Sequence, residues 1–195
     1  MQFGSVRLCG ILSALALAVF CFPCHAADEM TESRLLFDFA SPDTGQWEVV
    51  NDGVMGGRSK GHVDMEGDRL RFTGDLVTRG GGFTSIRTFR AFDLSGYDGL
   101  ELEARGNGRE FEVAVNDGRR YGWRTVSRRA PFDTGASWST VRVPFSALRA
   151  TVFGRPVRVA PVDLSAIERI GFYILDGKDG PFELEVRSIR AYRGR

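Results

Sequence analysis

The side chains that most often carry catalysis are scarce in this 195-residue chain. Histidine occurs only as His25 and His62, and all three cysteines precede His25. A nucleophilic serine or cysteine needs a neighbouring histidine, and a zinc ion needs several nitrogen or thiolate ligands. His62 lies in the alternating stretch 60–64, in which we expect its side chain to face solvent. The sequence therefore predicts no histidine-based catalysis, no metal site and no cofactor.

Paired carboxylates offer a different route to catalysis. Glycoside hydrolases use two acidic groups about 5–10 Å apart. Two pairs, Glu101 with Glu103 and Glu183 with Glu185, are spaced i, i+2 in alternating sequence. This spacing places both carboxylates of a pair on one face of a β-strand, where acidic residues are ordinarily solvated. A carboxylate-based hydrolase is therefore the last of three hypotheses about function.

Aspartates in turns supply the hard oxygen ligands that Ca²⁺ prefers. Asp176 and Asp179 lie in one such turn, and Asp93 and Asp98 lie near another. Neither run has the EF-hand spacing, and aspartate is common in turns because its side chain bonds the local backbone. The sequence favours turn-forming roles, and no residue is assigned as a metal ligand.

The stretch 50–61, VNDGVMGGRSKG, has an unusual composition. Glycine clusters persist where φ is positive or where another group approaches the backbone closely. No helix follows, so the stretch is not a P-loop. We expect a fixed corner in which Asn51 and Asp52 accept backbone hydrogen bonds, as in Asx turns. The sequence leaves open whether this corner also binds a partner. The candidate binding residues of the corner are Asn51, Asp52, Met55, Gly56, Gly57, Arg58 and Ser59.

Aromatic residues form a second group of candidates. Tyr121 and Trp123 lie in the short run YGWR. Aromatic side chains on the face of a sandwich are able to stack on sugar rings, which motivates a glycan-binding hypothesis. Trp138 instead begins an amphipathic stretch, and we expect it in the core.

Alternation of apolar and polar residues identifies the elements that must position these groups. The alternating stretches are 100–105, 110–115, 141–145 and 182–187. A period of two with one apolar face indicates half-buried antiparallel strands, and Asn-Gly or Asp-Gly turns separate them. Helix-forming sequence is limited to single turns near 145–149 and 164–168. We predict one all-β domain, a β-sandwich and more specifically a jelly roll.

The N-terminal segment 1–26 is typical of a secretory signal peptide. Arg7 is its one charged residue, an apolar run covers 11–22, and small residues precede the predicted cleavage after Ala26. The apolar run is shorter than the ~20 residues of a transmembrane helix. We therefore predict a single domain, 27–195, that is periplasmic or secreted and has no membrane span after cleavage.

The predicted mature chain carries 25 basic and 25 acidic residues and is neutral when His62 is uncharged. Nucleic-acid-binding domains usually need a basic surface, so we expect no nucleic-acid partner. All three cysteines leave with the signal peptide, so the domain has no disulfide and must be stabilised by its core.

Distinctive motifs extend over almost the whole predicted domain. They are Trp47 with NDGVMGGRS (51–59), FTG (72–74), GGGFTSIR (80–87), DLS (93–95) with YDGL (97–100), RGNGR (105–109), GF (171–172) and DGKDGPF (176–182). Together they resemble the complex I intermediate-associated protein 30 family. The resemblance implies a galactose-binding-domain-like β-sandwich without established catalytic residues. It also implies kinship with mitochondrial assembly factors that hold membrane-arm intermediates of respiratory complex I.

Predicted export changes what this resemblance implies. An exported protein cannot meet complex I intermediates on the cytoplasmic side of the membrane, so the family's role does not transfer directly. We expect first a non-catalytic binding or assembly factor that holds a protein partner, and second a carbohydrate- or glycan-binding module. Gly81 and Gly82 of the second glycine cluster, with Arg87 and Asp176 of the family motifs, complete the candidate binding residues.

Overall fold

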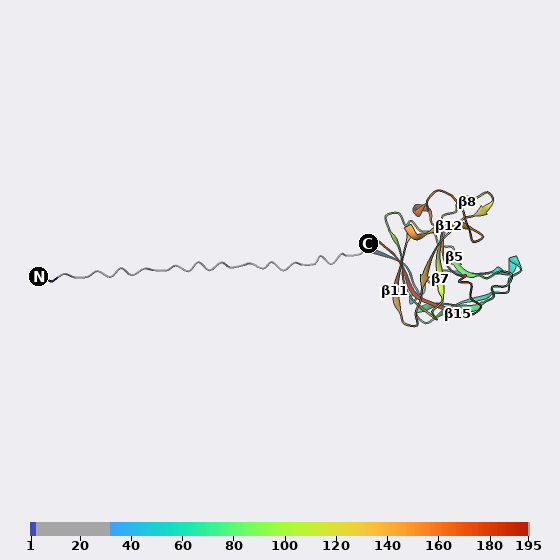
Figure 1. Ribbon diagram of the computed structural model, residues 1–195, viewed down its shortest axis with the longest axis horizontal. Helices are drawn as coiled ribbons and strands as arrows, with labels where there is room; N and C mark the ends of the chain where they lie inside the picture. Colours follow the sequence, from blue (N-terminus) through green and yellow to red (C-terminus); the bar gives the residue numbers. More distant parts are fainter. Residues whose placement is uncertain (3–31, 195) are drawn as a thin grey trace.

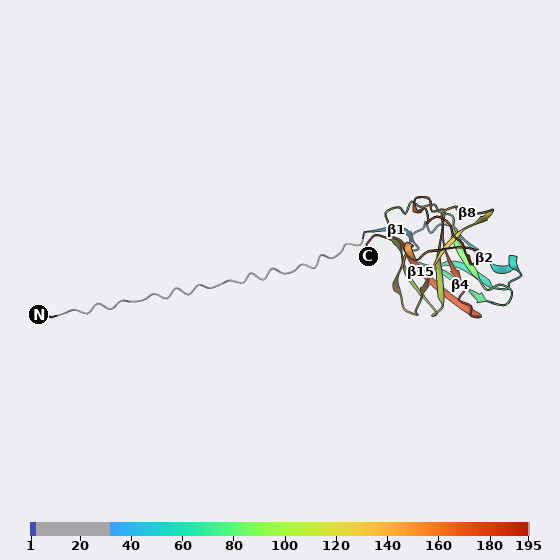
Figure 2. The same cartoon turned by 45° about the horizontal axis from the view of Figure 1, so that its top comes forward.

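The computed structural model describes residues 1–2 and 32–194, except for the side chains of Val54 and Met55. Two antiparallel β-sheets pack face to face, which confirms the predicted all-β sandwich of the jelly-roll type (Figures 1 and 2). From residue 3 onward the predicted signal peptide lies outside the described residues. No helix in the part of the chain that the structure describes is long and apolar enough to cross a membrane.

The first sheet, sheet A, contains six strands. They are β1 (Ser33–Asp38), β3 (Lys60–Glu66), β4 (Arg69–Leu76), β6 (Gly99–Gly106), β11 (Ser139–Pro144) and β15 (Gly180–Tyr192). Their order is β11-β6-β15-β4-β3, and β1 pairs with the second half of β15. A register shift between Val186 and Ser188 bends β15 against β6. The long strand β15 thus organises the sheet by pairing with three neighbours.

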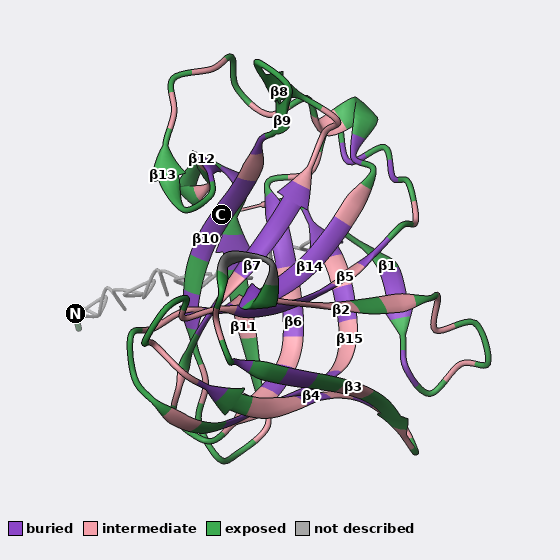
Figure 3. Ribbon diagram, turned by 90° about the vertical axis from the view of Figure 1, so that its right-hand side faces the viewer, coloured by how far each residue is buried: buried purple, intermediate pink, exposed green. Residues whose placement is uncertain are grey.

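The second sheet, sheet B, contains seven strands in the order β13-β12-β10-β7-β14-β5-β2 (Figure 3). They are β2 (Trp47–Asn51), β5 (Thr84–Thr88), β7 (Glu110–Asn116), β10 (Ser127–Asp133), β12 (Arg149–Val152), β13 (Arg155–Pro156) and β14 (Arg169–Ile174). A separate hairpin joins β8 (Arg120–Tyr121) to β9 (Arg124–Thr125).

Three short 3₁₀ turns complete the fold: η1 (Asp52–Met55), η2 (Phe145–Ala147) and η3 (Leu164–Ala166). The last two confirm the predicted single turns near 145–149 and 164–168. The predicted strands are confirmed as β6, β7, β11 and β15. His62 is exposed on β3, as the alternation predicted.

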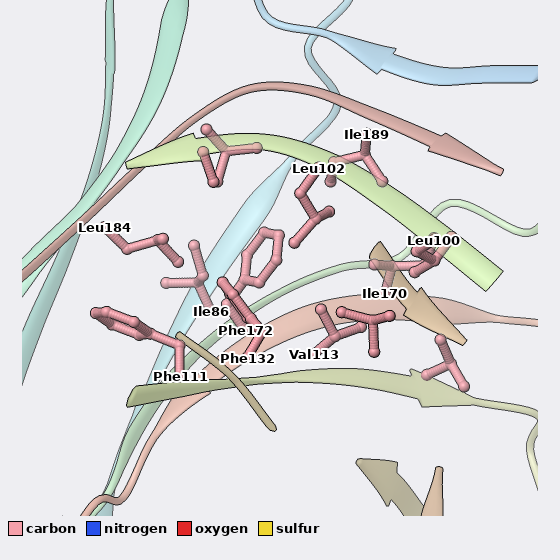
Figure 4. Packing of buried hydrophobic residues seen from close by; sticks show 14 of the residues in the cluster. Ile86, Leu100, Leu102, Phe111, Val113, Phe132, Ile170, Phe172, Leu184 and Ile189 are labelled. Carbon is pink, nitrogen blue, oxygen red and sulfur yellow. The ribbon is translucent and has the colours of Figure 1, made fainter. Parts of the chain in front are cut away.

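The core lies between the two sheets, and alternation of side chains along each strand supplies it (Figure 4). Fully buried side chains from sheet B meet fully buried side chains from sheet A. They include Phe111, Val113, Ile170 and Phe172 from sheet B, and Leu100, Leu102, Leu184 and Ile189 from sheet A. Each such side chain contributes about 1.5–3 kcal/mol relative to an exposed one. This burial stabilises the domain without a disulfide.

The expectation for Trp138 is wrong. Its side chain is half-buried against the guanidinium groups of Arg105 and Arg187, whose carbons lie 4.8 Å and 4.1 Å from its ring centroid. Arg105 pairs with Glu185 on the outer face of sheet A, so Trp138 covers that face instead of the core. Cation–π contacts, which the hydrophobic pattern does not register, hold it there.

Strand register places η1 and the β8–β9 hairpin at opposite ends of sheet B. Asn51, just before η1, pairs with Thr84, which pairs with Ile174 at the end of β14. Arg169, at the start of β14, pairs with Asn116, and the chain continues from there into β8. In Figure 1, η1 is the cyan ribbon at the right and β8 lies at the top.

Candidate functional site

Asp52 is the centre of the glycine-rich corner and is completely buried. Its Oδ1 accepts a hydrogen bond from Ser59 N at 3.0 Å. Its Oδ2 accepts from the Ser59 hydroxyl and from Gly82 N, both at 2.7 Å, and from Phe83 N at 3.4 Å. The carboxylate therefore fastens η1 to the start of β3 and to the turn that leads into β5.

Asn51 adds a second set of cross-links. Its Oδ1 accepts from Gly61 N at 3.0 Å and from the Thr84 hydroxyl at 2.6 Å. The prediction that Asn51 and Asp52 accept backbone hydrogen bonds is confirmed. The predicted Asx-turn geometry is wrong, because the donors lie between 7 and 33 residues away along the chain.

The glycines of both clusters are explained by this arrangement. A Cβ atom at Gly57 or Gly81 would lie within 3.0 Å of the Asp52 carboxylate, a separation that real Cβ atoms essentially never show. Gly56 and Gly82 have φ of 82° and 109°, in the region that favours glycine. The group that approaches the glycine backbone is thus Asp52 of the same chain.

The pKa of Asp52 is lower than its ordinary value. Burial by itself raises it, but hydrogen bonds from Gly82, Ser59 and Phe83 outweigh the burial. Asp52 is consequently ionised at neutral pH and serves as an acceptor for fixed donors. It is not placed to transfer a proton.

Arg58 differs from the buried residues of the corner. It is exposed and forms no ion pair with any described residue. The side chain of Met55, another candidate, lies outside the described residues. The predicted set therefore divides into a buried structural part around Asp52 and an outward-facing Arg58.

The corner leads directly onto the outer face of sheet B. The ring of Phe83 stacks with that of Tyr173, with centroids 6.3 Å apart and planes at 28°. Tyr173 faces outward because its neighbours Phe172 and Ile174 point into the core. By holding the backbone of Phe83, Asp52 also positions the ring that lies against Tyr173.

Two arginines flank Tyr173. The guanidinium carbon of Arg87 lies 6.0 Å from its ring centroid, and that of Arg129 lies 5.1 Å away. Arg87 Nη2 makes only long hydrogen bonds, to the Tyr173 hydroxyl at 3.3 Å and to Ser85 Oγ at 3.4 Å. Its Nε has no hydrogen-bond partner among the described residues. Arg87 is therefore only weakly tied to its neighbours, and its Nε is buried without a hydrogen-bond partner among the described residues.

Glu112 lies beside Arg129, whose Nη1 is 2.7 Å from Glu112 Oε2. The contact is an ion pair without hydrogen-bond alignment, since Oε2 has no hydrogen-bond partner in the described chain. Burial raises the pKa of Glu112, and the charge of Arg129 offsets this only in part. We define the Tyr173 surface as Phe83, Arg87, Glu112, Arg129 and Tyr173. Arg87 and the aromatic rings of the Tyr173 surface suit a ligand that combines acidic or carbonyl oxygens with an apolar part.

Tyr121 and Trp123 lie away from the corner, on the β8–β9 hairpin at the other end of sheet B. They are 54% and 72% exposed. Arg124 covers one side of Trp123, its guanidinium carbon 4.7 Å from the ring centroid. The structure thus separates the two groups of candidates that the sequence identified.

Asp176 is held by Arg109 at the end of β14. Arg109 Nε lies 2.6 Å from Asp176 Oδ2, and Nη2 lies 2.7 Å from Oδ1. These hydrogen bonds lower the pKa of Asp176. Asp179 in turn accepts from Thr78 N at 2.7 Å. The carboxylates of Asp176 and Asp179 already accept hydrogen bonds from protein donors, and they thereby anchor the turn. The described residues contain no cluster of three or more potential metal ligands.

Each glutamate of the two predicted pairs contacts arginine on the outer face of sheet A. The ion pairs are Glu101–Arg142 (2.7 Å), Glu103–Arg187 (3.3 Å), Glu183–Arg71 (2.9 Å) and Glu185–Arg69 (2.7 Å), with Arg105 also on Glu185. Burial by itself would raise the pKa of Glu185. Hydrogen bonds from Arg105 and Arg69 outweigh the burial, so the pKa of Glu185 is below its ordinary value. Because an arginine already pairs with every one of these carboxylates, the two pairs do not support the hydrolase hypothesis.

Two cavities are lined by none of the candidate binding residues. One, of about 500 Å³, is lined by the 42–46 loop and by Thr88, Phe89 and Arg90. The other, of about 340 Å³, lies between 91–93 and 165–168. The charged groups of the first cavity, Asp43 and Arg90, already pair with each other, so the Tyr173 surface is the better candidate.

Sequence reasoning missed four of the five residues of the Tyr173 surface. A signal for Tyr173 was present, because the stretch 169–174, RIGFYI, places an aromatic residue on its polar face. Glu112 and Arg129 also occupy polar positions of alternating strands. Strand order brings these positions together, and local sequence does not report strand order.

Similarity to known proteins extends over most of the chain. The model of the family described as Complex I intermediate-associated protein 30 (CIA30) matches residues 37–186. The uncharacterized protein C9E9.15 of Schizosaccharomyces pombe is 31% identical over 169 residues, which cover 74% of this chain and 77% of that protein. The mitochondrial complex I intermediate-associated protein 30 of Mus musculus is 27% identical over 192 residues. That match covers 84% of this chain but only 57% of the mouse protein.

A solved structure also shares the fold. The family 11 carbohydrate-binding module of the cellulosomal cellulase Lic26A-Cel5E of Clostridium thermocellum matches with a TM-score of 0.63 at 17% identity. The match covers 84% of this chain and 95% of the module. At this identity the likeness concerns the β-sandwich alone. The family model, in contrast, covers most of the described domain and includes the Asp52 corner, and the chain belongs to the Complex I intermediate-associated protein 30 (CIA30) family.

Proposed function

We propose that this protein is a non-catalytic, assembly-factor-like binding protein that holds a protein partner outside the cytoplasm through the Tyr173 surface. The observation that carries the proposal is the environment of Tyr173. Its ring lies between Arg87 and Arg129, and the Nη2 of Arg87 is held only by long hydrogen bonds to the Tyr173 hydroxyl and Ser85 Oγ. Such a surface combines an aromatic ring for stacking with hydrogen-bond donors of arginine. Tyrosine and arginine are enriched among the residues that contribute most to protein–protein binding.

Family membership supports a protein partner. The mouse relative is named as a protein associated with complex I intermediates, but this chain spans only 57% of it. Its partners are therefore not carried over. The signal-peptide pattern of 1–26 supports export, and an exported protein would meet its partner outside the cytoplasm. Arg87, which is partly exposed, favours a segment that presents carboxylates or backbone carbonyls, whereas Arg129 is buried and paired with Glu112.

Site-specific photocrosslinking tests the proposal. We would replace Phe83 with p-benzoylphenylalanine, and as a control place the same group at Met65, which is exposed on β3 of sheet A. The periplasmic or secreted fraction of the native source provides the partner. A discrete crosslinked protein from position 83 and none from position 65 is expected. Crosslinks from position 65 alone, or none from either position, would contradict the proposal.

Glycan binding is the second candidate, because the fold matches a carbohydrate-binding module and Tyr173 presents an aromatic ring on a sheet face. The ring is only half-buried, so part of it is accessible for stacking. A glycan array distinguishes the candidates. Binding that disappears in Tyr173→Ala, together with no protein crosslink from position 83, would favour the glycan.

A further inference from the structure

Two adjacent hairpins each end in an exposed aromatic residue. Trp123 lies in the two-residue turn between β8 and β9, and Phe153 lies in the turn between β12 and β13 (Figure 3). They are 72% and 65% exposed. The guanidinium carbon of Arg124 lies 4.7 Å from the Trp123 ring centroid and 4.9 Å from that of Phe153. We call Tyr121, Trp123, Arg124 and Phe153 the hairpin tip.

The backbone of Phe153 adds an independent observation. Its φ is 48°, and it is the only non-glycine residue with positive φ in the part of the chain that the structure describes. Bulky residues rarely adopt this conformation, and asparagine or glycine would form the same turn more readily. Packing does not explain the phenylalanine, because its side chain is exposed. Strain of this kind points to a function for the ring.

Charge is strongly asymmetric around the tip. Between residues 118 and 162 Asp133 is the one acidic residue, and it lies at the far end of β10 from the hairpins. The same segment contains exposed arginines on or beside the two hairpins: Arg119, Arg120, Arg124, Arg149, Arg155 and Arg158. Nearby, Asp117 is buried and paired with Arg128, and Glu168 lies against Gly118 at the base. The tip is therefore basic although the predicted mature chain is neutral.

We propose that the hairpin tip docks on a lipid surface that carries anionic headgroups. Tryptophan, tyrosine and phenylalanine favour the interface of a bilayer, and arginines beside them attract anionic headgroups. Two short turns project the rings outward, which suits a flat, deformable surface better than a preformed pocket. The tip and the corner at Asp52 lie at opposite ends of sheet B, so this docking would leave the Tyr173 surface accessible to a partner.

Vesicle co-sedimentation of the purified protein tests the proposal. Vesicles of phosphatidylcholine alone are compared with vesicles that also contain phosphatidylglycerol. We expect binding only to the second kind, with a blue shift of tryptophan fluorescence, and weaker binding as salt screens the charges. Phe153→Gly, which suits the positive φ, and Trp123→Ser should each lower the partition coefficient several-fold. The blue shift should be absent in Trp123→Ser.

Charge reversal provides a matched pair of variants. Arg155→Glu with Arg158→Glu should weaken vesicle binding at least about tenfold, because each cation near an anionic surface contributes to binding. Arg58→Glu with Lys60→Glu changes the net charge equally at the glycine-rich corner and the start of β3, away from the hairpin tip, and should bind as the wild type does. Equal loss in both double variants, or no binding of the wild type, would overturn the proposal. Binding to polyglutamate but not to the vesicles would also overturn it, in favour of an acidic protein surface.

Discussion

The backbone N–H of Gly82 donates a 2.7 Å hydrogen bond to Oδ2 of Asp52, although the two residues are 30 positions apart. One buried carboxylate thereby joins the two glycine clusters of the chain. Gly57 and Gly81 leave room for it, and Ser59 completes its hydrogen bonds. The unusual composition of the corner follows from the space and the donors that Asp52 requires.

Replacing Asp52 with asparagine should destabilise the domain by about 2–3 kcal/mol, because hydrogen bonds to a charged acceptor are lost and an amide N–H₂ meets backbone donors. Chemical denaturation followed by tryptophan fluorescence measures the change in the free energy of unfolding. An unchanged unfolding midpoint would mean that the carboxylate does not hold the corner together.

Alanine at Gly57 or Gly81 should destabilise the domain by at least about 2 kcal/mol, because the added Cβ meets the Asp52 carboxylate. Gly53→Ala is the matched control. A Cβ at Gly53 has no atom within 4 Å and φ there is not positive, so this variant should stay within about 0.5 kcal/mol of the wild type. Similar losses for all three variants would show that the corner needs glycine for flexibility and not for space.

Stability should fall in acid. Folding lowers the pKa of Asp52, Asp117, Asp176 and Glu185. A lowered folded-state pKa gives stability that is fully present above the unfolded pKa of about 4 and is lost as pH falls through the folded value. The free energy of unfolding, measured from neutral pH downward, should therefore decrease below about pH 4. In Asp52→Asn the decrease should be smaller, and a wild-type profile that stays flat in acid would refute this account.

Asp176→Asn should destabilise the domain by about 3 kcal/mol, because it leaves the largely buried Arg109 without its anionic partner. Arg109→Lys should also destabilise it, since lysine cannot make the two parallel hydrogen bonds. Addition of Ca²⁺ should leave the wild-type melting temperature unchanged. A rise in melting temperature that is lost in Asp176→Asn would instead make the turn a calcium site.

The sequence was sufficient to predict the sandwich because strands such as β6 and β7 alternate cleanly and are separated by glycine turns. It also indicated that Asn51 and Asp52 would accept hydrogen bonds. It did not reveal their donors, since the pairing of Asp52 with Gly82 depends on strand order. Trp138 was misplaced for a related reason, because Arg105 and Arg187 come together over it only when β6 and β15 pair.

The Tyr173 surface was less accessible to sequence reasoning than the corner. Phe83, Arg129 and Tyr173 belong to three segments that are adjacent only in the folded sheet. Each occupies an ordinary polar or turn position by itself. Glycine, by contrast, marks the corner directly, because its conformational requirements are local.

Capture of a partner by purified variants tests the central claim most directly. Wild type, Arg87→Glu and Arg58→Glu, each shown to be folded by thermal denaturation, are used as bait in the native periplasmic or secreted fraction. Binding through the Tyr173 surface predicts that wild type and Arg58→Glu capture the same protein and that Arg87→Glu does not. Capture by Arg87→Glu together with loss in Arg58→Glu would contradict the account and make the Asp52 corner itself the interaction surface.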